Sequence, residues 1–176
     1  MSVLILFASI EGQTGKIARF IEAEVGRLGH EATLVDVSGK MAEVTFDGFD
    51  TVILAAPVHE RRHPPNFEIL LTASRVDLAA RRTLMISVSL GAAFPELNEE
   101  AKDYLVEMKL RTGLAPNAEA LVAGAVRPSS YDYYETEILR HAVLRNQTID
   151  PGTQEREFTD WNALKAAVAE FVSTDI

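Results

Sequence analysis

The fold is decided by residues 3–14, which read VLILFASIEGQT. Residues 3–7 form a short, continuous apolar run, which is the pattern of a strand buried on both faces of a parallel sheet. Residues 14–28 follow with apolar side chains at helical spacing, and Gly29 stands where it can cap the helix C-terminus. The sequence therefore begins with a buried strand, a short polar loop and an amphipathic helix.

The same alternation of strand and helix continues along the chain. Apolar runs predict four further strands, and helical spacing predicts three further helices. We therefore predict one α/β domain over residues 1–176, with a parallel sheet covered by helices on both faces. The further strands are predicted at residues 32–37, 51–56, 83–88 and 118–126, and the further helices at residues 64–71, 97–108 and 160–172, the last with Asp160 as its N-cap.

One stretch interrupts this alternation, namely residues 127–159 between the fifth strand and the last helix. It is too long for a simple connection between a strand and a helix. Within it, Tyr131, Tyr134, Ile138 and Ala142 recur at helical spacing, which predicts a helix inside the insertion. Two interpretations follow: the insertion packs over the sheet edge, or it forms a lid or docking surface beside a site at the carboxyl ends of the strands.

The composition excludes several classes of protein. The chain has 17 Lys and Arg against 26 Asp and Glu, which gives a net charge of −9. This balance argues against non-specific binding to nucleic acid and against docking on anionic lipid. The absence of cysteine excludes disulfides, thiolate metal sites and a cysteine nucleophile. With no apolar run near the roughly 20 residues of a membrane span and no evident signal peptide, we expect a cytoplasmic protein.

The loop at residues 9–14 has the features of a phosphate site. It joins the carboxyl end of a strand to a helix N-terminus, where free N–H groups and the positive end of the helix dipole favour an anion. Ser9 and Thr14 add hydroxyl groups, and Gly12 lets the backbone approach a ligand closely. The alternative is that Ser9 and Thr14 only cap the helix and Gly12 only forms a turn.

Other nucleotide and phosphate motifs do not fit this loop. A Walker A motif would need glycine at position 10 and Ser or Thr after Gly15-Lys16, but the chain has Ile10 and Ile17 there. The missing glycine at position 10 also excludes the dinucleotide pattern G-x-G-x-x-G. A phosphoacceptor receiver domain would need an aspartate at the end of the third strand, which instead ends in Ala-Ala-Pro at residues 55–57.

The loop resembles the flavodoxin phosphate loop, [ST]-x-[ST]-G-x-T, except that Glu11 stands at the third position. We expect Glu11 to turn outward and lend only its N–H, because a carboxylate would repel a phosphate. Nearly the whole chain resembles one flavodoxin subfamily, the menaquinone-dependent protoporphyrinogen oxidases. The shared features are the acid-Gly-Gln-Thr loop at residues 11–14, Ala-Gly-Ala at residues 123–125 with an Arg-Pro step and a Tyr-rich segment after it, and Phe-Thr-Asp-Trp at residues 158–161.

The resemblance implies a fold and a cofactor. The fold is a flavodoxin-like, doubly wound, five-stranded parallel sheet in the order 2-1-3-4-5, with a long insertion after the fifth strand. The cofactor is FMN, with its phosphate on the first loop and its ring between two further loops. The implied FMN-binding residues are Ser9, Ile10, Glu11, Gly12, Gln13, Thr14, Pro57, Val58, His59, Glu60, Ser89, Leu90, Gly91 and Ala92.

The resemblance also implies an activity, namely an FMN-dependent oxidoreductase of heme biosynthesis. It would oxidise protoporphyrinogen IX to protoporphyrin IX and pass the electrons to a quinone. Arg61, Arg62 and Arg127 would bind the substrate carboxylates, which a guanidinium can pair with bidentately. Two alternatives remain open: a flavodoxin-like electron carrier whose negative surface meets a basic redox partner protein, and an NAD(P)H:quinone reductase. The sequence indicates neither a catalytic residue nor an oligomeric state.

The insertion departs from that subfamily, in which it is basic and apolar and is thought to face membrane quinone. Here residues 131–137 carry Asp132, Glu135 and Glu137 and no Lys or Arg, and Arg140, His141 and Arg145 follow only later. Basic residues supply the attraction to an anionic membrane surface, so we expect no stable membrane binding. We also predict no metal site, because the pair His59 and His63 flanks a loop before two prolines and has no further ligand at a typical spacing.

Overall fold

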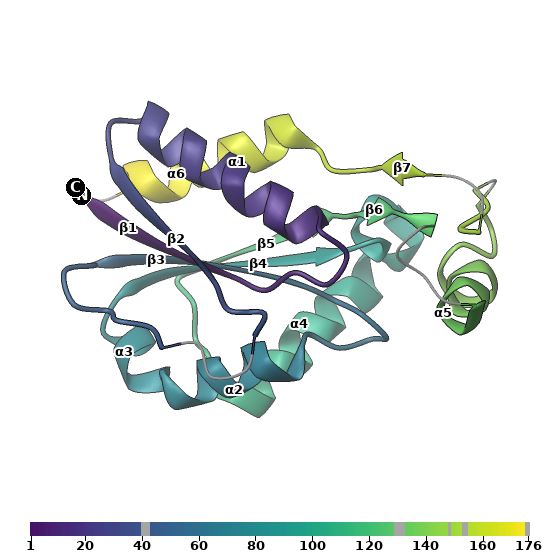
Figure 1. The fold of residues 1–176 in the computed structure, drawn as a ribbon, viewed down its shortest axis with the longest axis horizontal. Coiled ribbons are helices and arrows are strands. Elements are labelled where there is room, and N and C mark those ends of the chain that lie inside the picture. The colour runs from purple at the N-terminus through teal and green to yellow at the C-terminus, as the bar shows by residue number, and fades with distance from the viewer. Residues whose placement is uncertain (40–42, 129–132, 148, 153–154, 175–176) are drawn as a thin grey trace.

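The computed structural model describes residues 1–39, 43–128, 133–147, 149–152 and 155–174. Five parallel strands form one sheet in the order β2-β1-β3-β4-β5 with helices on both faces (Figure 1). This confirms the predicted doubly wound topology. The strands are β1 (Ser2–Phe7), β2 (Glu31–Asp36), β3 (Thr51–Pro57), β4 (Arg82–Ser89) and β5 (Ala118–Ala123).

Helices cover both faces of the sheet (Figure 1). On the first face lie α1 (Gln13–Arg27) and α6 (Trp161–Ser173). On the second face lie α2 (Pro65–Ala73), α3 (Arg75–Ala79) and α4 (Asn98–Thr112). In the described part of the chain, no helix combines the length and the apolar character that crossing a bilayer requires.

The helix ends follow the capping predicted from the sequence. Asp160 accepts a hydrogen bond from the Ala163 N–H at 3.0 Å and so caps the start of α6. Gly29 has a φ of +86° just beyond α1, and the His30 N–H donates to the Val25 carbonyl at 3.2 Å. These bonds satisfy backbone groups that a helix end would otherwise leave unpaired.

The central strands are apolar throughout because each face has its own core. In β1, Ile5 and Phe7 point into the core beneath α1 and α6, whereas Leu4 and Leu6 point into the core beneath α2 and α4. All four side chains are at most 6% exposed. Alternate residues of one strand thus fill two cores, which explains the continuous apolar run in the sequence.

The predicted fifth strand at residues 118–126 is wrong in its last part. The chain leaves the sheet at Gly124, whose N–H donates to the Ser89 carbonyl at 3.1 Å and whose carbonyl accepts from the Phe158 N–H at 3.0 Å. After this break, β6 (Ala125–Val126) pairs antiparallel with β7 (Arg156–Glu157). The strand ends early because its backbone pairs with the returning end of the insertion.

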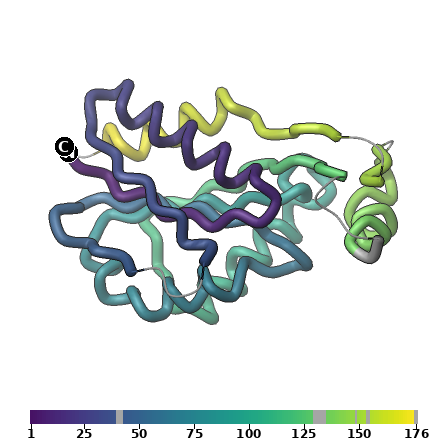
Figure 2. The backbone as a smooth tube through the Cα atoms, in the orientation of Figure 1, coloured from purple at the N-terminus to yellow at the C-terminus, as the bar shows by residue number. Residues whose placement is uncertain are grey.

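The insertion lies at the end of the molecule opposite the two chain termini, as Figure 2 shows. It contains α5 (Tyr133–Ile138) followed by one π-helical segment, η4 (Leu139–Val143), so the predicted helix is confirmed for Ile138 and Ala142. Tyr131 lies outside the described residues. A small buried cluster of Phe94, Val126 and Leu144 joins the insertion to the segment that follows β4.

Candidate functional site

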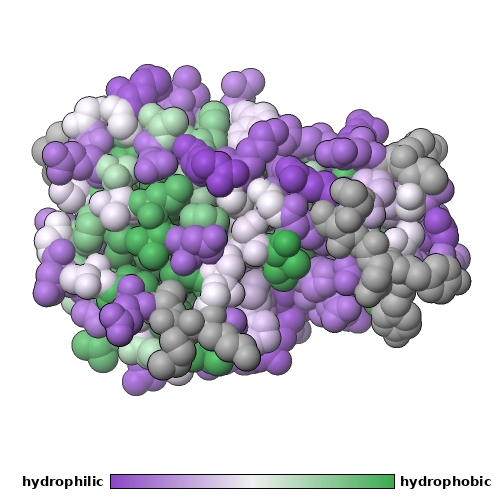
Figure 3. All heavy atoms as spheres, in the orientation of Figure 1, coloured by the Kyte–Doolittle hydropathy of each residue, from purple (hydrophilic) through white to green (hydrophobic). Residues whose placement is uncertain are grey.

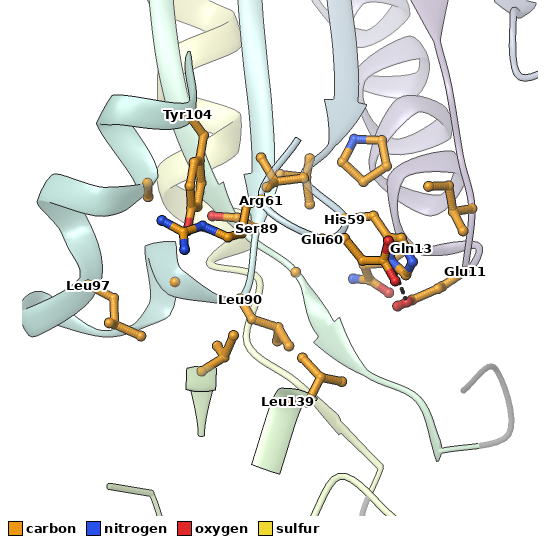
Figure 4. A pocket seen from close by; sticks show the side chains of 18 of the residues that line it. Glu11, Gln13, His59, Glu60, Arg61, Ser89, Leu90, Leu97, Tyr104 and Leu139 are labelled. Carbon is orange, nitrogen blue, oxygen red and sulfur yellow. Dashed lines mark ion pairs between the residues drawn. The ribbon is translucent and has the colours of Figure 1, made fainter. Parts of the chain in front are cut away.

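A pocket of about 220 Å³ opens where β1, β3 and β4 end (Figure 4). The three loops predicted to hold FMN all contribute to it. Ser9, Gly12 and Ala92 belong to these loops but are not among the lining residues. The predicted residues that line the pocket are Ile10, Glu11, Gln13, Thr14, Pro57, Val58, His59, Glu60, Ser89, Leu90 and Gly91.

The first loop is shaped by Ser9 and Gly12. The Ser9 hydroxyl oxygen accepts hydrogen bonds from the Gly12 N–H at 3.1 Å and the Gly15 N–H at 3.3 Å. The Ser9 N–H in turn donates to the Ser38 hydroxyl at 2.8 Å. Gly12 has a φ of +95°, a conformation that glycine adopts without the strain a side chain would bring. The loop is therefore held in a turn that directs the chain into α1.

The start of α1 faces the pocket with groups that suit an anion. Gln13 and Thr14 begin the helix, line the pocket and are 5% and 2% exposed. The first turn of a helix carries N–H groups without intrahelical partners and the positive end of the dipole. Together with the tight turn at Gly12, this geometry fits a phosphate group.

The second loop is a tight turn after β3. The His59 N–H donates to the Arg62 carbonyl at 2.8 Å, and the Arg62 N–H donates back to the His59 carbonyl at 3.1 Å. Between them, Glu60 and Arg61 have φ values of +50° and +67°. Two consecutive non-glycine residues in this region are strained, and such strain clusters at functional sites. The turn places His59, Glu60 and Arg61 in the wall of the pocket.

The side chain of Glu11 contradicts the expectation that it would turn outward. It lines the pocket, and its Oε1 lies 3.6 Å from Nδ1 of His59 (Figure 4). The two side chains are only 22% and 28% exposed. The imidazole supplies a partner for the carboxylate, which explains the inward orientation. Glu135 of α5 brings a second carboxylate to this place, and one ligand-type atom from each of the three residues lies within 4.8 Å of the others.

A second polar group lies on the α4 side of the pocket. The Tyr104 hydroxyl donates to Glu100, and the Arg61 guanidinium lies 6.0 Å from the centre of the tyrosine ring. Burial and, after it, the hydrogen bond to Glu100 together raise the pKa of Tyr104 to about 12. The phenol therefore keeps its proton at neutral pH.

The three arginines predicted to bind substrate carboxylates do not share one place. Arg61 lines the pocket, and its side chain is 79% exposed. Arg62 instead pairs with Glu68, with Nη2 at 2.8 Å from Oε2 of a side chain that is only 7% exposed. Arg127 lies against the first loop, where its Nη2 donates to Oε1 of Gln13 at 2.5 Å. Buried acceptors thus hold two of the three arginines elsewhere.

Sequence reasoning offered the insertion as a lid beside the site, but it assigned no side chain of the insertion or of α4 to the pocket wall. Ile138 and Ala142 carried a signal, because their helical spacing marks one face of the insertion helix. Tyr104 lies in the helix predicted at residues 97–108, in which Leu105 and Met108 pack into the core whereas Tyr104 lines the pocket. The missed lining residues are Val88, Leu97, Glu100, Ala101, Tyr104, Gly124, Ala125, Glu135, Ile138, Leu139, Ala142 and Val143.

Comparison with known proteins identifies the family and one group of relatives. The model of the flavodoxin domain family matches residues 4–151. The chain is 26% identical over 166 residues to protoporphyrinogen IX dehydrogenase [quinone] of Escherichia coli strain K12, an alignment that covers 92% of this chain and 89% of the relative. The same identity and coverage are found for the protein of that name in Escherichia coli O157:H7.

Solved structures share the fold. Oxidised flavodoxin 1 from Bacillus cereus superposes with a TM-score of 0.60 at 18% identity, and the alignment covers 99% of each chain. A flavoprotein from Lactobacillus acidophilus, solved in complex with FMN, superposes with a TM-score of 0.50 at 16% identity and covers 68% of this chain and 92% of its own. Both likenesses support the same sheet topology.

Proposed function

Because the chain belongs to the flavodoxin family, we propose that it is an FMN-dependent oxidoreductase that oxidises protoporphyrinogen IX and passes the electrons to a quinone. The 26% identity to the protoporphyrinogen IX dehydrogenase [quinone] of Escherichia coli supports this substrate. The observation that carries the proposal is the second wall of the pocket, which the insertion and α4 build opposite the three loops. A protein that exchanges electrons only with another protein needs no such wall.

The residues present fit FMN. Its phosphate suits the loop at residues 9–14, where Gly12 turns the backbone and α1 begins. Its ring suits the space between the loop at residues 57–61 and the loop at residues 89–91, which both line the pocket. When bound, FMN supplies a ring that accepts a hydride and later releases the electrons, while the protein sets position and electrostatics.

The remaining wall suits a large, mostly apolar substrate. Leu97, Ala101, Ile138, Leu139 and Ala142 line the pocket from α4 and from the insertion. Apolar side chains exclude water from the reacting centre and orient an apolar ring system. At the rim, the exposed Arg61 supplies a guanidinium for a substrate carboxylate, in the role expected of it. The Tyr104 phenol holds its proton and offers a neutral polar group beside this arginine.

A second candidate is an electron carrier for a basic protein partner. The observation that favours it is the net charge of −9 together with acidic side chains in the pocket wall, namely Glu11, Glu60, Glu100 and Glu135. Negative surfaces steer basic partners toward the site and accelerate their association. A carrier would exchange electrons with that partner and leave protoporphyrinogen unchanged.

The test is anaerobic turnover of the FMN-loaded protein. Protoporphyrinogen IX should bleach the visible flavin absorbance and produce porphyrin fluorescence, and a water-soluble naphthoquinone should restore the absorbance. Leu139→Glu places a charge in the apolar wall and should slow porphyrin formation at least about tenfold. The matched control is Leu110→Glu, because Leu110 of α4 is 81% exposed. Normal flavin binding with no porphyrin formed would favour the carrier instead.

A further inference from the structure

Gln13 is a junction between the first loop and both ends of the insertion. Its Oε1 accepts a hydrogen bond from Nη2 of Arg127 at 2.5 Å. Its Nε2 donates to Oε1 of Glu157 at 2.8 Å and to the Thr159 hydroxyl at 3.0 Å. Arg127 directly follows β6, where the insertion begins, whereas Glu157 and Thr159 stand where it ends. One side chain therefore ties the loop to both ends.

The surroundings of Gln13 make this junction specific. The residue is 5% exposed, so its amide depends on these protein partners rather than on water. Thr159 is fixed in turn, because its hydroxyl donates to the Ala123 carbonyl at 2.6 Å. Glu157 also accepts hydrogen bonds from Lys16 at 2.5 Å and from the Trp161 indole at 3.2 Å. The guanidinium of Arg127 further contacts the loop backbone, with Nη1 at 3.4 Å from the Glu11 carbonyl oxygen.

Beyond this junction, the insertion reaches the pocket. Ile138, Leu139 and Val143 line it, and Leu139 and Val143 also pack on the buried cluster of Phe94, Val126 and Leu144. The backbone of Gln13 starts the helix turn proposed to bind phosphate, while its side chain holds the base of the insertion. A shift of either one requires a shift of the other.

We propose that Gln13 is a positioning residue that couples phosphate binding on the first loop to the placement of the insertion over the pocket. The proposal rests on the FMN site proposed above. A ligand phosphate that fixes the backbone at Gln13 also fixes the side chain that holds Arg127, Glu157 and Thr159. Because coupling between two sites is reciprocal, loss of the junction should weaken the binding of the phosphorylated ligand.

Hydrogen exchange on the full-length protein tests this coupling through peptides that cover residues 135–147. The protein is compared without ligand, with FMN and with riboflavin, which has the same ring but no phosphate. The ring can protect the insertion by direct contact, so the difference between FMN and riboflavin isolates the effect of the phosphate. In the wild-type protein, FMN should slow exchange in this segment about fivefold more than riboflavin does.

Two substitutions at Gln13 should remove that difference. Gln13→Ala deletes the amide, and Gln13→Glu keeps an acceptor for Arg127 but loses the donor and places a negative charge beside Glu157. Both variants should bind FMN about fivefold more weakly while their affinity for riboflavin stays the same. The control is Lys16→Met, which removes an exposed ion pair to the same Glu157 and leaves the junction intact. This control should retain the wild-type difference.

The outcomes separate this proposal from the proposed function. If the wild-type protein does not bind FMN, both are overturned. If it binds FMN but FMN and riboflavin protect residues 135–147 equally, only the coupling is overturned, and this comparison needs no variant. Full retention of the difference in a folded Gln13 variant would also overturn the coupling while leaving the FMN site intact.

Discussion

Nε2 of His63 lies 2.9 Å from the Ser87 hydroxyl oxygen, and both residues are only 1% exposed. His63 stands just before α2, and Ser87 lies on the face of β4 that α2 covers. Burial lowers the pKa of His63 to about 4, because the attraction of nearby Glu68 offsets the loss of hydration only in part and Arg111 lowers the pKa further. The protein thus folds around a neutral imidazole.

This pair predicts a loss of stability in mild acid. The unfolded chain takes up a proton at His63 near pH 6.5, whereas the folded chain does so only near pH 4. Between these values the unfolded state binds more protons, so the free energy of unfolding falls as the pH falls. We expect a loss of about 2 kcal/mol between pH 7 and pH 5, measured by urea denaturation.

His63→Gln should flatten this pH dependence, because it removes the buried titrating group. The control is His141→Gln, whose side chain is 73% exposed and contacts Glu137. It should leave the slope between pH 7 and pH 5 as in the wild-type protein. An unchanged slope in folded His63→Gln would contradict the assignment of the acid sensitivity to His63.

The contacts of the Glu68 carboxylate with Arg111 and Arg62 should make a second contribution to stability. Burial would raise the pKa of this carboxylate, but hydrogen bonds from Arg111 and Arg62 outweigh it and hold the pKa below its ordinary value. The resulting stabilisation is present above pH 4.5 and lost as the pH falls further. Glu68→Gln should lower the free energy of unfolding by about 2 kcal/mol at pH 7, because it weakens two charge-assisted contacts to a buried group.

A matched control for Glu68→Gln is Glu99→Gln, because the Glu99 side chain is 85% exposed and pairs with Lys102. Exposed pairs contribute at most about 1 kcal/mol. Thermal or urea unfolding of both variants gives the comparison. Equal, small effects of the two substitutions would show that Glu68 does not join α2 and α4 in the way that its contacts indicate.

Gly12 should be essential for binding FMN. Its φ of +95° disfavours any side chain, and a Cβ there would lie 3.1 Å from Nη1 of Arg127. Gly12→Val should therefore weaken FMN binding at least about tenfold, or 1.4 kcal/mol, as measured by quenching of flavin fluorescence. Gly26→Val is the control, because a Cβ at Gly26 meets nothing within 4 Å. Equal affinity for FMN in the two folded variants would contradict the assignment of the FMN phosphate to this loop.

The protein should not sediment with anionic vesicles, even at low salt. Figure 3 shows mostly hydrophilic side chains among the coloured atoms around the insertion, and the net charge of −9 repels an anionic surface. Low ionic strength is the demanding condition, because any attraction between basic side chains and the vesicle surface is screened least there. Substantial co-sedimentation, abolished when the insertion is replaced by a short linker, would show that this segment docks on membranes despite its charge.

Most of the fold was predictable because the three central strands, β1, β3 and β4, are buried on both faces. Apolar runs located these strands, and capping residues such as Gly29 and Asp160 located helix ends. The break at Gly124 was not predictable, since it depends on hydrogen bonds to Ser89 and to the distant Phe158. Local sequence carries no information on which remote segment will compete for a strand's backbone.

The candidate site, like the fold, could be predicted from the sequence only in part. The three loops were predicted because a flavodoxin-like loop has a local pattern, shown here by Gly12 and Thr14. The inward side chain of Glu11 was not predicted, because its partner His59 comes from another loop. The sequence also did not indicate that Arg62 and Arg127 lie apart from Arg61. Arg62 pairs with Glu68 and Arg127 donates to Gln13, and the local sequence around each arginine does not identify these acceptors.

The contacts of Gln13 have a consequence for the order of events during synthesis. Its partners Glu157 and Thr159 stand 144 and 146 residues further along the chain. A growing chain folds its N-terminal parts first, so β1 and α1 can pack while the ribosome still holds the end of the protein. The junction at Gln13, however, is completed only after Thr159 has emerged. A pocket with both walls in place therefore requires that the insertion at residues 127–159 has been synthesised.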